Sequence, residues 1–133
     1  VKNHAISTDQ PGLSKRLGDA IGQNIAETRD DHEYPELRTR RFDMPRQALW
    51  SALTSAGWQL GWQLESQDET EGHMHWVITT SIFRFKDDLH IYIRSDSDNS
   101  HALYVRSQSR VGKGDMGQNR RHVLRLLHEL QAG

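Results

Sequence analysis

Three glycines near the carboxyl end of the chain have the spacing of a nucleotide-binding turn. Gly112, Gly114 and Gly117 form a G-x-G-x-x-G in the stretch VGKGDMG, after an expected strand and before an expected helix. A dinucleotide fold needs a second parallel strand, with an acidic residue about 20 positions further on to hold the ribose. Here a single helix follows, with Glu129 as the nearest acid beyond the motif. A P-loop also fails, because neither Ser nor Thr follows Lys113.

The same stretch favours a joint between a strand and a helix. Glycine adopts positive φ without steric cost, and Asp115 can cap the helix that follows. The alternative is an anion site at the helix N-terminus, where free backbone N–H groups would be joined by cationic side chains. The candidate anion- or ligand-binding residues are Arg94, Arg106, Arg110, Lys113 and Asn119.

Two adjacent carboxylates, Asp87 and Asp88, begin an expected strand. Neighbouring strand residues point to opposite faces, so the two side chains are not expected to converge on one ligand. We expect instead that one of them pairs with Arg106 or Arg110. The expected structural polar network comprises Asp87, Asp88, Ser107, Ser109 and Asp115.

No motif supports a metal site or a serine nucleophile. A zinc site would need three histidines from two strands, and no H-E-x-x-H pattern accompanies His73, His75 and His90. Two serines lie within range of His101 and His122, but the chain has no G-x-S-x-G elbow. We therefore predict no catalytic residues, no metal and no cofactor. Tryptophans that could line a ligand pocket, with core packing as the default, are Trp58, Trp62 and Trp76.

Hydrophobic spacing predicts the elements that must position these residues. A helix is expected over 45–56, with Asp43 as a candidate cap and Gly57 at its end. A last helix is expected to begin near Met116. The expected strands cover 37–44, 58–65, 73–80, 89–93 and 103–109.

The order of these elements predicts an α+β fold. Short turns between strands imply antiparallel pairing, and one apolar face per strand implies helices on one side. We expect two layers, a four- to five-stranded antiparallel sheet covered on one face by helices, in the order β-α-β-β-β-β-α. The inner face should include Trp58, Trp62, Trp76, Ile78, Leu89, Ile91, Ile93, Leu103 and Val105.

Length and composition limit the domain organisation and the classes of protein to which the chain can belong. The 133 residues suffice for one core, and we expect a polar, partly helical arm over 1–33 followed by a single α+β domain over 34–133. The net charge of -1 argues against a general nucleic-acid binder. No apolar run is long enough to span a membrane, and no cysteine is present. The chain begins at Val1, which leaves an upstream signal or anchor as an open expectation.

Two long stretches, FRFKDDLHIYIRS and YVRSQSRVGKGDMGQNRRHVL, resemble the bacterial and plastid domain-of-unknown-function family 1499. The resemblance covers about 34–130 and is densest between Arg106 and Asn119. The chain departs from it in having no upstream stretch with cysteine, and in carrying His122 where an arginine is expected. The resemblance implies no assigned reaction. Because many members look secreted or membrane-attached, it favours an envelope location, periplasmic or membrane-tethered.

The sequence thus predicts a non-enzymatic binding or accessory domain of the cell envelope. Its expected ligand is an apolar or amphiphilic small molecule or a protein partner, and association with a membrane surface is a further candidate. The alternative is a small enzyme or anion-binding domain that uses the basic segment 106–119.

Overall fold

The computed structural model describes residues 25–111 and 117–132, which form one sheet and two α-helices. The elements are β1 (Ile25–Glu27), the short 3-10 helix η1 (Pro35–Leu37), β2 (Arg40–Phe42), α2 (Arg46–Gln59), β3 (Gln63–Asp68), β4 (His73–Thr79), β5 (Lys86–Ser97), β6 (Ser100–Ser109) and α3 (Gln118–Ala132). Residues 1–24, which include most of the expected arm helix, lie outside the described ranges.

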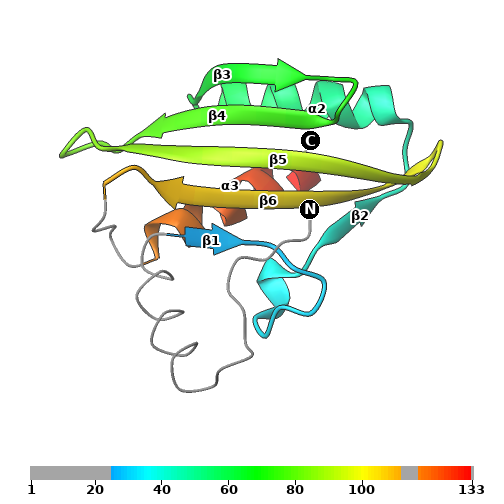
Figure 1. Cartoon of the computed structure of the whole chain (residues 1–133), viewed down its shortest axis with the longest axis horizontal. Helices are drawn as coiled ribbons and strands as arrows, with labels where there is room; N and C mark the ends of the chain where they lie inside the picture. Colours follow the sequence, from blue (N-terminus) through cyan, green and yellow to red (C-terminus); the bar gives the residue numbers. More distant parts are fainter. Residues whose placement is uncertain (1–24, 112–116, 133) are drawn as a thin grey trace.

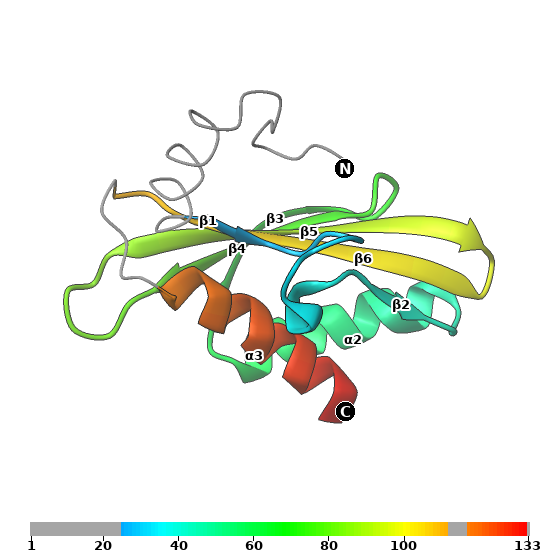
Figure 2. The same cartoon turned by 90° about the horizontal axis from the view of Figure 1, so that it is seen from below.

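The strands form one antiparallel sheet in the order β1-β6-β5-β4-β3, with β2 also paired to β6 (Figure 1). Both helices cover the same face of this sheet (Figure 2). The predicted two-layer α+β fold is therefore confirmed. β1 adds a strand from the last part of the 1–33 segment, since Ile25 pairs with Gln108 of β6.

The core lies between the sheet and the two helices. Alternating residues of β4, β5 and β6 point inward as predicted, and Met74, Trp76 and Leu89 are fully buried. Burying a large apolar side chain contributes about 1.5–3 kcal/mol, so this face of the sheet contributes substantially to stability. The helices contribute Leu49, Leu53, Val123, Leu126 and Leu127.

The strand predicted over 58–65 is wrong in its first half. Helix α2 continues to Gln59, and Gly61 then ends it at a φ of 79°. The N–H of Trp62 donates to the carbonyl of Gly57 and that of Gly61 to the carbonyl of Trp58, each at 3.0 Å, which is the Schellman termination. Trp58 is therefore a helical residue and is 56% exposed, not part of the inner face.

Two details of the predicted helix also need correction. Gly57 does not end it; this glycine lies in the helix because a Cβ there would come within 2.4 Å of the Trp76 ring. Asp43 does not cap it, since Pro45 occupies the N-cap position and no side-chain cap bond forms. Gly57 is needed because the helix packs tightly against the sheet at this position, and the local sequence does not predict that contact.

Candidate functional site

The turn between β4 and β5, residues 80–85 and hereafter the hairpin tip, is closed by two hydrogen bonds donated by backbone N–H groups. The N–H of Thr80 donates to the carbonyl of Phe85 at 2.8 Å, and the N–H of Phe85 donates to Oγ1 of Thr80 at 2.9 Å. Arg84 has a φ of 59°, a left-handed conformation that is uncommon outside glycine. Such backbone strain concentrates at functional segments.

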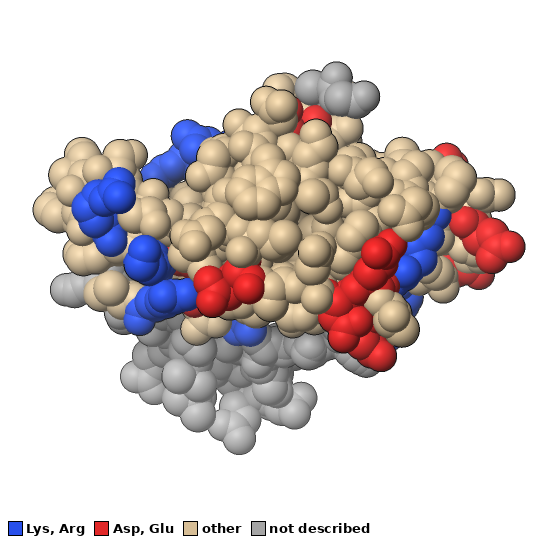
Figure 3. Space-filling model, turned by 90° about the horizontal axis from the view of Figure 1, so that it is seen from above, with Lys and Arg blue, Asp and Glu red and all other residues tan. Residues whose placement is uncertain are grey.

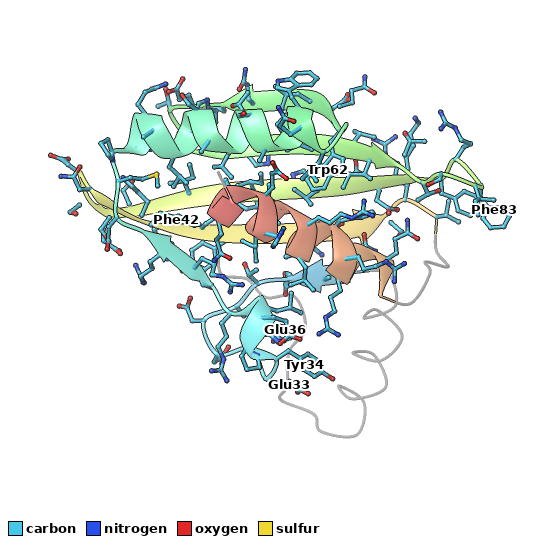
Figure 4. The ribbon with its side chains drawn as sticks, turned by 180° about the vertical axis from the view of Figure 1, so that it is seen from behind. Glu33, Tyr34, Glu36, Phe42, Trp62 and Phe83 are labelled. Carbon is cyan, nitrogen blue, oxygen red and sulfur yellow. The ribbon has the colours of Figure 1, made fainter. Side chains whose placement is uncertain are left out.

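Large apolar side chains on the hairpin tip face solvent. Ile82 is 81% exposed and Phe83 is 73% exposed, and the rings of Phe83 and Phe85 lie 5.6 Å apart between centroids. Figure 4 shows Phe83 at the extremity of the molecule, pointing away from both helices. Of the six large hydrophobic side chains exposed in the described ranges, four lie at this end: Ile82, Phe83, Phe85 and Val111.

The base of the hairpin is held on the outer face of the sheet, opposite the helices, by Asp88. Its carboxylate accepts two bonds from Arg110, each 2.9 Å long, and a third contact from Nε2 of His75 at 2.7 Å. The guanidinium of Arg110, and then the His75 ring, lower the pKa of Asp88 to about 2. The prediction that an aspartate pairs with Arg106 or Arg110 is confirmed by this pair. Asp115, the expected helix cap, lies outside the described residues.

Asp87 points to the opposite, inner face, as the strand geometry requires. Its carboxylate lies 2.8 Å from Nε2 of His122 on α3, and both side chains are almost completely buried. Nearby in α3, Oδ1 of Asn119 accepts a bond from Oγ of Ser107 at 2.7 Å, while its Nδ2 donates to Ser109 at 2.9 Å. These contacts fasten α3 to β5, the strand that follows the hairpin tip, and to its neighbour β6.

Three histidines of β4 and β5 form a row on the outer face of the sheet. Nε2 of His73 lies 2.8 Å from Nδ1 of His90, and the ring of His75 stacks on His90 with centroids 4.3 Å apart. Burial lowers the pKa of His73, and burial and then the neighbouring histidines lower the pKa of His90 to about 4. Within ranges 25–111 and 117–132, no group of three or more His, Asp or Glu residues is arranged to hold a metal ion.

The candidate anion-binding residues that the structure describes do not gather at one point. Arg106 lies 3.6 Å from Glu27 and opposite His90 of β5. Arg94 is exposed and lies four residues further along β5 than His90. At about 3.3 Å per residue, those positions are about 13 Å apart. Asn119 is buried between two serines, and Lys113 falls in the segment that the structure leaves undescribed.

Neither Ser107 nor Ser109, the serines considered for a nucleophile, contacts His101 or His122 through an identified hydrogen bond. Nδ1 of His101 bonds to Oγ of Ser95 at 2.8 Å, whereas Ser107 and Ser109 both contact Asn119. The exposed hairpin tip was not singled out from the sequence. Its signal was visible: SIFRF places three apolar residues in a turn that breaks the alternation of two strands.

No helix in the described parts of the chain has the length and apolar character needed to cross a membrane.

The family described as protein of unknown function, DUF1499, matches residues 5–130. No curated protein matches the sequence significantly.

Proposed function

We propose that this chain, which belongs to the DUF1499 family, is a non-enzymatic binding domain that docks on anionic membrane surfaces through its hairpin tip. The observation that carries the proposal is the exposure of Ile82 and Phe83 on a turn whose backbone is closed by hydrogen bonds. A contiguous exposed apolar cluster is a common mark of a contact surface.

The shape of the cluster favours a bilayer over a small ligand. Small-molecule sites are concave and surround most of their ligand, whereas the hairpin tip projects from one end of the sheet (Figure 2). Phenylalanine and isoleucine on a narrow projection can enter the acyl boundary while the sheet remains outside. Burial of each such side chain contributes up to about 1.5–3 kcal/mol.

Charge supports an anionic surface in particular. The exposed cations Arg84 and Lys86 flank the apolar side chains, while the acids that follow are already paired, Asp87 with His122 and Asp88 with Arg110. In Figure 3, Lys and Arg gather toward the left end, where the hairpin tip lies, and Asp and Glu mostly toward the centre and right. Basic residues near an anionic bilayer contribute about 1 kcal/mol each.

The buried polar groups support binding over catalysis by the 106–119 segment. Ser107 and Asn119 bond to each other, and His122 bonds to Asp87, all below the surface. These side chains make the contacts expected of a scaffold that holds the hairpin in place. An enzyme would instead present titratable groups to a space that a substrate can enter.

Vesicle co-sedimentation tests the proposal, with phosphatidylcholine vesicles that do or do not contain phosphatidylglycerol. The wild type should bind the anionic vesicles more strongly. Ile82→Ser/Phe83→Ser should lower the partition coefficient by at least about tenfold, because both inserted side chains are lost. Lys86→Glu should weaken binding mainly at low salt.

The matched control is Tyr34→Ser, which removes an exposed aromatic ring from a different surface (Figure 4). This variant should bind as the wild type does. Equal binding by the wild type and Ile82→Ser/Phe83→Ser would refute membrane docking by the hairpin tip. If the wild type binds no vesicles, membrane docking is refuted. The apolar cluster would then be a candidate contact surface for a protein or a small amphiphile, the partners expected from the sequence.

A further inference from the structure

The three histidines of β4 and β5 are defined here as the imidazole row: His73, His75 and His90. The ring planes of His73 and His90 are within 5° of parallel and their centroids lie 5.1 Å apart. With their nitrogens 2.8 Å apart, the two rings lie nearly end to end and share a single hydrogen between them. The third ring, His75, stacks on His90 and contacts Asp88.

Strands β1, β3, β5 and β6 carry charged or aromatic side chains around the imidazole row. Asp68 of β3 lies opposite His73 in the strand register, and Arg106 of β6 lies opposite His90. Tyr92 of β5 stacks on His73. Glu27 of β1 is paired with Arg106, and Asp88 with Arg110. Three acids and two arginines give this group a formal charge of -1 when the histidines are neutral and +2 when all three are protonated.

We propose that the imidazole row is an acid-responsive element that strengthens docking of the hairpin tip on anionic bilayers as the pH falls. This rests on the proposed function. The shared N–H···N bond requires one unprotonated nitrogen, so His73 and His90 resist full protonation until the medium is acidic. Once protonated, they add positive charge to the sheet that carries the hairpin.

The depressed pKa values of His73 and His90 agree with this geometry, because burial and neighbouring histidines both oppose their charged forms. The pairs His75–His90 and Thr79–Lys86 are four residues apart along the hairpin, about 13 Å at 3.3 Å per residue. The screening length is about 10 Å at 0.1 M salt and about 30 Å at 0.01 M. The acid effect should therefore be largest at low salt.

Vesicle binding of the full chain at about pH 7.5 and about pH 4, where His90 takes up its proton, tests the element. In anionic vesicles at about 10 mM salt, the wild type should gain about threefold to tenfold more affinity on acidification than His73→Gln/His90→Gln does. His128→Gln, an exposed histidine on α3, should keep the full gain. The wild type and the variants share the same carboxylates. The difference between their acid-induced gains in affinity therefore excludes the effect of carboxylate titration.

Imidazole NMR titration gives a second readout that does not depend on vesicles. His73 and His90 should titrate together and below the usual range, since each responds to the proton held by the other. Independent titration near pH 6.5 would overturn the proposal. An equal acid gain in the wild type and in His73→Gln/His90→Gln would overturn the acid-responsive element and leave hairpin docking standing. No binding at either pH would overturn both.

Discussion

Nε2 of His122 on α3 lies 2.8 Å from the carboxylate of Asp87 on β5, and fewer than a tenth of either side chain is exposed. An ionised carboxylate can only accept, so Nε2 carries the hydrogen. This bond joins the last helix to the strand that leaves the hairpin tip. It is one of the buried polar contacts between the two layers, and it should be costly to break.

Replacing His122 with alanine should lower the free energy of unfolding by about 3–5 kcal/mol, because the Asp87 carboxylate would be buried without a partner. His128→Ala, on the exposed side of the same helix, should stay within about 0.5 kcal/mol of the wild type. Urea unfolding measures both. Adding Asp87→Asn to His122→Ala should restore part of the loss, and similar values for the two single variants would contradict a stabilising role for this bond.

The pair of Asp88 and Arg110 should contribute less, although it has two hydrogen bonds. The Arg110 side chain is 45% exposed and its charge is screened by solvent, so Arg110→Ala should lower the free energy of unfolding by much less than His122→Ala does. Because the folded pKa of Asp88 is depressed to about 2, its stabilising contribution is complete above the ordinary carboxylate range and is lost as the pH falls toward 2. Asp88→Asn should therefore flatten the acid side of the stability curve. If Asp88→Asn leaves the slope of unfolding free energy against pH unchanged between about pH 4 and pH 2, ionised Asp88 does not stabilise the fold.

The stability of the protein should also decline over a second, less acidic window because of His90. The pKa of His90 is about 4 in the folded protein, against 6.5 for a histidine in the unfolded chain. As the pH falls, the unfolded chain therefore binds the proton first. Stability should decrease as the pH falls from 6.5 to about 4 and should change little from this group above 6.5. Denaturant midpoints measured across that window should fall less in His90→Gln than in the wild type. His128→Gln, as the control, should follow the wild type.

Gly57→Ala should destabilise the protein even though alanine is the better helix former. In an open helix the change would gain about 1 kcal/mol. Here the new Cβ would lie 2.4 Å from the Trp76 ring, and overpacking of this kind costs about 1–3 kcal/mol. Ser55→Ala, at an exposed position of the same helix, should be neutral or slightly stabilising. Thermal melts that show a gain at Gly57 would mean that Trp76 can shift without loss.

Much of the fold was predictable because strand alternation is a local property of the sequence. Met74, Trp76 and Ile78 of β4, and Leu89, Ile91 and Ile93 of β5, face the core as their spacing indicates. The same rule placed Asp87 and Asp88 on opposite faces. The order of strands and turns was then sufficient to predict an antiparallel sheet with helices on one side.

Local spacing failed where two periodicities fit the same residues. Trp58, Leu60 and Trp62 alternate like a strand, but the end of α2 and its Gly61 termination use the same pattern. The partner of Asp87 was also missed, because His122 is 35 residues away and reaches it only through packing of α3 on the sheet.

Sequence by itself therefore determined the inward faces, the antiparallel order and the family to which the chain belongs. Tertiary structure decided which charged and imidazole groups meet, because cross-strand register and helix packing join positions that are distant along the chain. It also decided the exposure of the hairpin tip. Ile82 and Phe83 have core-like side chains, and only the absence of a covering helix or strand within the described residues leaves them in solvent.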